Sequence, residues 1–193
     1  MKNHRTLTAL FLAAALTSLI APLGATDIFK ARMLTGRAPI EPAVVNVQIE
    51  IESYTTAEEV RALQMVLNQG DFDAFVSAFS QYNKGTARFK YTRGFNLPIH
   101  AAISTPTETG KKVLAFFNRQ NYKVEAATRV GRFRFMVMEL EINLKGKGSG
   151  RFYEDALINL DPNLGTITLE SYESAPVIFP SVVEVVKKDP AKK

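Results

Sequence analysis

The strongest constraint in this sequence is a two-residue alternation of apolar and polar side chains that recurs along much of the chain. Val45, Val47, Ile49 and Ile51 alternate with Asn, Gln and Glu residues. A period of two is typical of a β-strand with one buried and one solvated face. The same pattern predicts strands over residues 87–92, 135–144, 151–160, 166–172 and 177–186.

Short links separate these alternating segments. Residues 106–110 lie between two apolar stretches at 99–105 and 112–117, and the sequence KGKGSG at 145–150 joins two further predicted strands. Two neighbouring parallel strands need a connection of a dozen or more residues, and these links are shorter than that. The pattern therefore predicts antiparallel hairpins.

Two helices are predicted between residues 55 and 82. Thr55 with Glu58, or Thr56 with Glu59, fits a capping box in which hydroxyl and carboxylate bond the free amides of a helix start. This predicts a helix over 55–69 that ends at Gly70.

Asp71 is expected to cap a second helix over 71–82, which carries a stripe of apolar side chains at helical spacing, Phe72, Phe75, Val76 and Phe79. Such a stripe is typical of a helix that packs on a sheet. The predicted fold class is α+β, with an antiparallel sheet of about seven or eight strands curled into a sandwich or open barrel and two helices packed against it near the N-terminus.

The N-terminus has the layout of a signal peptide. Lys2 and Arg5 precede an uncharged apolar run over residues 9–23, which is shorter than the roughly 20 residues of a membrane-spanning helix. We predict a signal peptide over 1–25, no transmembrane span after its cleavage, and an exported protein that is periplasmic or secreted. Residues 26–43, with Pro39 and Pro42, are predicted to be an extended leader, residues 44–187 a single domain, and residues 188–193 a basic tail.

Composition argues against several kinds of site. The chain has no cysteine, which excludes disulfides, thiolate metal sites and a lipid-modified N-terminus, and His100 is the one histidine after the signal segment. The KGKGSG segment fits neither common phosphate-loop motif and has no helix after it. We therefore predict no catalytic residues, no metal site and no cofactor. Glu139 and Glu141 on one strand face leave a hydrolase of unknown class as a third hypothesis.

Charge is strongly segregated along the chain. Residues 41–82 hold seven acidic side chains and one arginine, whereas residues 83–134 hold eleven basic side chains and two glutamates. Basic side chains interleaved with aromatic ones are typical of surfaces that bind anions. The predicted anion-binding residues are Arg88, Lys90, Arg93, Lys111, Lys112, Arg119, Lys123, Arg132 and Arg134. In the alternative interpretation, the acidic segment faces the basic one and the fold neutralises itself.

These features lead to ranked hypotheses of function. The first is an exported, non-enzymatic protein that binds an anionic lipid or glycan surface of the envelope, or a protein partner. The alternative is a carrier of a small apolar ligand inside the sheet, lined by phenylalanines and by Met136 and Met138. Nucleic acid is not an expected partner, because the signal segment directs the chain out of the cytoplasm.

Several segments resemble a group of uncharacterised secreted bacterial single-domain proteins. The likeness lies in SYTTAEEVRALQMVLNQG, the MELEI strand, the KGKGSG turn, the INLDPNLGTITLESY hairpin and the closing SAPVIFPSVVEV, and so spans most of residues 44–186. The resemblance implies a compact, secreted single domain. It implies no activity, because these segments correspond to strands, caps and turns.

Overall fold

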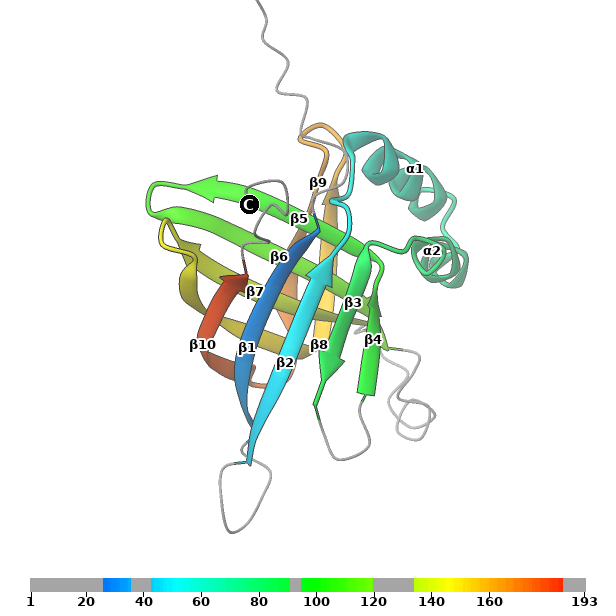
Figure 1. The fold of residues 1–193 in the computed structure, drawn as a ribbon. Coiled ribbons are helices and arrows are strands. Elements are labelled where there is room, and N and C mark those ends of the chain that lie inside the picture. The colour runs from blue at the N-terminus through cyan, green and yellow to red at the C-terminus, as the bar shows by residue number, and fades with distance from the viewer. Residues whose placement is uncertain (1–25, 36–42, 91–94, 120–133, 186–193) are drawn as a thin grey trace, which may run out of the picture.

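The computed structural model describes residues 26–35, 43–90, 95–119 and 134–185, and it shows an antiparallel sheet with two helices packed against it (Figure 1). This confirms the predicted α+β class. The helices are α1 (Ala57–Leu67) and α2 (Phe72–Phe79). The strands are β1 (Asp27–Thr35), β2 (Ala43–Ile51), β3 (Gly85–Phe89), β4 (Phe95–Ile99), β5 (Ala101–Thr107), β6 (Gly110–Asn118), β7 (Phe135–Asn143), β8 (Lys147–Asp161), β9 (Thr166–Tyr172) and β10 (Val177–Val185).

The described strands form one sheet in the order β4-β3-β2-β1-β10-β8-β7-β6-β5, with β9 also paired to β8. The sheet curls without closing into a barrel, and its two ends meet where the chain passes from β4 to β5 through His100. There the N–H of His100 donates to the carbonyl of Phe116 at 2.9 Å, and the N–H of Lys84 donates to the carbonyl of Ile99 at 2.7 Å. The ten strands exceed the seven or eight that we expected.

Strand β1 corrects the prediction of an extended leader over residues 26–43. It lies in the middle of the sheet, paired with β2 on one side and β10 on the other (Figure 1). Its inward side chains, Phe29, Ala31 and Met33, are at most 3% exposed. Pro39 and Pro42, which were part of that prediction, lie outside the described residues. The described domain therefore begins at β1 and not at residue 44.

The sheet has a separate hydrophobic core on each face. The inner core lies within the curl and contains Phe29, Met138, Phe152 and Phe179. The outer core holds both helices against part of the convex face, where Phe75 and Phe79 pack on Phe135 with ring centroids 5.9 and 5.1 Å apart. All sheet residues in the outer core come from β5, β6, β7, β8 and β9. The helices thus cover that part of the sheet and leave the outer face of β1, β2 and β10 outside this core.

Local signals place both helices as the sequence predicts, within a few residues. Of the two possible capping boxes, Thr56 with Glu59 is the one that forms: the Thr56 N–H donates to Glu59 Oε2 at 2.8 Å, and the Glu59 N–H donates to Thr56 Oγ1 at 3.3 Å. Asp71 caps α2 by accepting the N–H of Ala74 at 2.9 Å. Gly70 separates the helices with a φ of 81°, a conformation that favours glycine.

Candidate anion-binding surface

Most of the predicted anion-binding residues are ion-paired in the structure. Of the six that the structure describes, five contact carboxylates; Arg93, Lys123 and Arg132 lie outside the described residues. The pairs are Arg88 with Glu50 at 3.1 Å, Lys111 with Glu184 at 2.6 Å and Asp27 at 3.5 Å, Lys112 with Glu139 at 2.7 Å, Arg119 with Asp155, and Arg134 with Asp73 at 3.1 Å. Lys90 is exposed just after β3.

These residues do not share one open face. Lys111 points to the inner side of β6, where its Nζ lies 5.4 Å from the ring centroid of Phe29 in the inner core. Lys112, the next residue, points to the outer side and contacts Glu139. Arg134 is held by Asp73 in the first turn of α2. The basic segment of the sequence is therefore divided between the two faces of the sheet.

Lys111 belongs to a polar cluster at the edge of the inner core. It lies between Asp27 and Glu184, and the hydroxyl of Tyr54 donates to Asp27 Oδ2 at 2.6 Å. Burial, together with the hydrogen bond to Asp27, raises the pKa of Tyr54 well above its ordinary value. The tyrosine therefore stays protonated and donates, and the lysine balances the two carboxylates.

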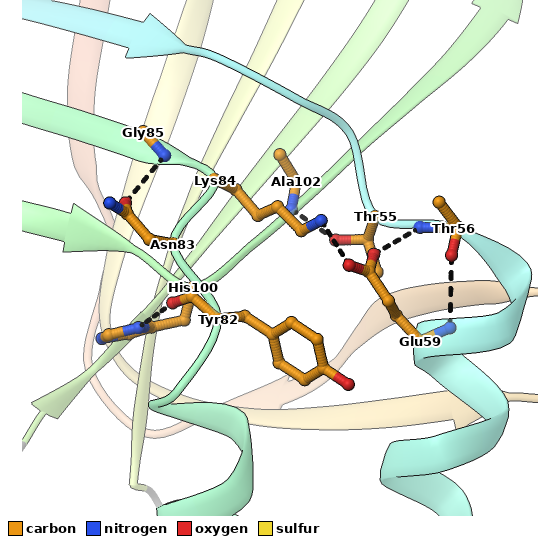
Figure 2. Close-up of polar contacts among 9 residues, drawn as sticks. All are labelled: Thr55, Thr56, Glu59, Tyr82, Asn83, Lys84, Gly85, His100 and Ala102. Carbon is orange, nitrogen blue, oxygen red and sulfur yellow. Dashed lines mark hydrogen bonds and ion pairs between the residues drawn. The ribbon is translucent and has the colours of Figure 1, made fainter.

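A second polar cluster joins α1 to the sheet (Figure 2). Lys84 is buried, and its Nζ contacts Glu59 Oε1 at 2.6 Å, while the other oxygen of Glu59 accepts the Thr56 N–H at the helix start. Thr55 extends the attachment, because its N–H donates to the Ala102 carbonyl at 2.7 Å and its hydroxyl accepts the Ala102 N–H at 2.9 Å. These contacts have a structural explanation, and no substrate is needed to account for them.

His100 lies beside this cluster and is 8% exposed. Its Nδ1 is 2.8 Å from the carbonyl of Tyr82, to which the neutral ring donates (Figure 2). Its ring packs against that of Phe79, with 5.6 Å between centroids. Burial lowers the pKa of His100 below the ordinary 6.5. The contacts assign His100 a packing role at the junction of β4, β5 and α2.

Glu139, one of the two glutamates that suggested a hydrolase, is ion-paired as well, and so is the buried Asp155 on the neighbouring strand. Glu139 is 6% exposed and lies between Lys112 at 2.7 Å and Arg151 at 3.1 Å. Asp155 pairs with Arg119 and accepts the hydroxyl of Ser174 at 2.8 Å, which holds the bend between β9 and β10. Both carboxylates are therefore engaged in contacts that hold neighbouring strands together.

The residues proposed to line a carrier cavity lie in the inner core. Met136 and Met138 are at most 1% exposed and belong to the same cluster as Phe117 and Phe152, whose rings meet edge to face at 6.3 Å. These side chains are in contact with one another within the curl of the sheet.

A different basic surface lies on the outer face of β1. Lys30 and Arg32 are exposed, and all of their partners in the two neighbouring strands are uncharged. Lys30 lies between Gln48 and Val183, and Arg32 lies between Asn46 and Ser181. Within the described residues neither side chain has a carboxylate partner. These two cations therefore keep their charge available to solvent, unlike Lys111 or Lys112.

Exposed apolar side chains accompany these two cations. Leu34 pairs directly with Val44 on β2 and with Ile178 on β10, so the three form one row across the sheet. They are 38%, 43% and 44% exposed, and Val183 beside Lys30 is 41% exposed. We call these six residues the basic face: Lys30, Arg32, Leu34, Val44, Ile178 and Val183.

The sequence analysis missed the basic face because it assigned residues 26–43 to a leader. A signal was nevertheless present, since Phe29, Ala31 and Met33 alternate with Lys30, Arg32 and Leu34. The short segment is strand-like by period, but only its pairing with β10, about 150 residues later in the chain, shows that both of its edges are occupied.

Comparison with known proteins adds no family to this description. No protein-family model, no curated protein and no solved structure matches the chain. Neither of the helices in the described part of the chain is long and apolar enough to span a membrane.

Proposed function

We propose that this chain is an exported, non-enzymatic protein that binds an anionic surface of the cell envelope through the basic face. The observation that carries the proposal is the position of Lys30 and Arg32 in the middle of the sheet. Both are exposed, the residues paired directly with them on β2 and β10 are uncharged, and neither has a carboxylate partner among the described residues. The predicted signal peptide supports an envelope partner over a nucleic acid.

Charge and shape support a broad, flat partner. Unpaired cations attract an anionic surface over about 10 Å at 0.1 M salt, so the attraction weakens as salt is added. Leu34, Val44 and Ile178 are about half-buried in the free protein. Covering the rest of each side chain would contribute roughly 1 kcal/mol or less, so the apolar row adds to charge attraction without replacing it.

The test is sedimentation of the exported protein with vesicles, after its recovery from the periplasm of a bacterial host. We expect binding to vesicles that contain phosphatidylglycerol, weak binding to pure phosphatidylcholine, and a steep loss between about 50 and 300 mM salt. Arg32→Gln should reduce binding several-fold. The matched control is Arg61→Gln, because Arg61 is an exposed arginine on α1, outside the basic face.

Equal effects of Arg32→Gln and Arg61→Gln would show that net charge alone drives the binding and would overturn the assignment of the basic face. Binding that is insensitive to salt, or equal on neutral vesicles, would overturn the proposed function itself.

A further inference from the structure

An open pocket of about 340 Å³ lies at the tips of two hairpins, β5–β6 and β7–β8. The pairing of Gly110 with Asn143 brings these tips together, and the N–H of Leu144 donates to the Thr109 carbonyl at 3.0 Å. Residues of the KGKGSG segment line one side, and residues of β6 line the other. The pocket is thus held by two neighbouring hairpins of the same sheet.

The lining has the chemistry of a site for an oxyanion. Three lysines and a single carboxylate, Glu141, are among the lining residues, and the remaining polar groups include hydroxyls and one amide. Asn143 uses its Oδ1 to accept the N–H groups of Lys145 at 2.9 Å and Lys147 at 3.1 Å, which leaves its amide N–H groups as donors. Ammonium, hydroxyl and amide donors together match the acceptor oxygens of a phosphate group.

Lys147 differs from the other two lysines of the pocket. Lys111 is held by Asp27 and Glu184, and Lys112 is held by Glu139. Lys147 is exposed and has no carboxylate partner within the described residues. It pairs across the sheet with Val183, which is also the neighbour of Lys30. The pocket therefore continues the basic face.

We infer that this pocket binds a phosphate group, with Lys147 as its main cation and Thr107, Thr109, Ser149 and Asn143 as hydrogen-bond donors. The inference rests on the proposed function, because it names the chemical group on the anionic surface that the protein would recognise. The group can come from a lipid headgroup or from a soluble phosphate ester.

This binding differs from that of a glycine-rich phosphate loop. The KGKGSG segment is a hairpin in which Gly146 takes a φ of 71° and Gly148 lies in strand β8. A Cβ at Gly148 would lie 1.7 Å from the Glu141 carbonyl, so this glycine serves the close approach of β7 and β8. Recognition in the pocket would come from side chains, since no helix follows the turn.

The experiment is a titration of the exported, ¹⁵N-labelled protein with inorganic phosphate and with glycerol 3-phosphate, followed by amide chemical shifts. We expect saturable shifts confined to residues 107–112 and 141–149. Lys147→Gln should weaken the fitted affinity at least five-fold. Lys145→Gln is the matched control, because Lys145 lies in the same turn, is exposed and does not line the pocket. Shifts without saturation, or equal losses in both variants, would overturn the inference.

Vesicles distinguish the two sources of phosphate and separate this inference from the proposed function. If a lipid headgroup is the ligand, Lys147→Gln should weaken binding to phosphatidic acid vesicles more than Lys145→Gln does. Saturable phosphate binding without this difference would assign the pocket to soluble phosphate esters. Arg32→Gln should weaken vesicle binding and leave the phosphate titration unchanged. If vesicle binding needs Arg32 but not Lys147, and phosphate causes no saturable shifts, the inference about the pocket would be overturned and the proposed function would stand.

Discussion

Two groups of basic residues in this protein differ in whether they form ion pairs. The group between residues 83 and 134 is dense in the sequence, and its described members mostly pair with carboxylates, as Lys84 does with Glu59 and Lys111 does with Glu184. The group on β1 consists only of Lys30 and Arg32, yet both remain exposed without a carboxylate partner among the described residues. The number of charges in a segment therefore does not predict how much charge reaches the surface.

The reason lies in the register of the sheet. Each basic residue in a strand faces whatever residue the neighbouring strands place opposite it. Arg88 faces Gln48 directly but reaches Glu50, two residues further along β2, whereas Arg32 faces Asn46 and Ser181. Oppositely charged side chains that meet across two strands stabilise a sheet modestly. A basic side chain without such a pair can bind an anionic partner instead. Two predictions test this difference between structural and available cations, and a third concerns the buried His100.

The largest effect is expected from Glu59→Ala, which would leave the ammonium of Lys84 buried and unpaired. It would also remove half of the capping box at the start of α1. We expect a loss of about 3 kcal/mol in the free energy of unfolding, measured by urea titration, because an uncompensated buried charge is costly.

Glu58→Ala is the control for Glu59→Ala. Glu58 lies in the same helical turn, and its side chain is 77% exposed, so its loss should cost much less stability than the loss of Glu59. Similar losses in the two variants would show that the pair of Lys84 and Glu59 contributes no more than a surface pair.

A smaller loss of stability is expected from Lys111→Met. Compared with Lys30→Met, this variant tests one lysine from each of the two groups. The change leaves Asp27 and Glu184 facing each other beside the inner core without their shared cation. We expect about 1.5 kcal/mol of destabilisation in urea, reduced from the value for a fully buried pair because these side chains are partly exposed.

Lys30→Met is the counterpart on the basic face and should change stability by less than about 0.5 kcal/mol. A larger loss for Lys30→Met than for Lys111→Met would reverse the comparison, because it would make the exposed lysine the structural one.

The smallest effect concerns pH, and it tests whether His100 is held in the neutral form. Its pKa is lowered in the folded protein by burial, so the unfolded chain binds more protons as the pH falls through about 6.5. The contribution of His100 to the free energy of unfolding is therefore fully present above about pH 6.5 and is lost as the pH falls below it. The loss ends when the ring is also protonated in the folded protein. The melting temperature should fall between about pH 7.5 and 5.5.

His100→Asn should make that fall smaller, because asparagine can donate to the Tyr82 carbonyl and does not titrate. The measurement is the difference between the two melting temperatures at each pH. An identical pH dependence in both proteins would mean that His100 titrates alike in the folded and unfolded states.

Much of the local structure follows from short-range signals. The capped helices, the strand at 135–143 and the turn around Gly165 are set by residues close in sequence, through periodicity, side-chain capping and glycine at a φ of 63°. Strand β1 was misjudged for the opposite reason. Its pairing partner β10 is at the other end of the chain, and nothing near residue 30 indicates that partner.

The candidate site shows the same division. The sequence indicated anion binding from charge density, and it identified KGKGSG as a hairpin. It could not show that Lys112 pairs with Glu139 while Lys147 has no carboxylate partner in the described part of the chain, because both facts depend on which strands become neighbours.

By itself, the sequence determined an antiparallel strand-rich domain without thiols, with two capped helices, because alternation and capping act over a few residues. Only the tertiary structure decided which charges are neutralised and which remain on the surface. Charge pairing depends on distances of a few ångströms, and here the curling of the sheet sets those distances between residues as remote as Asp27 and Lys111.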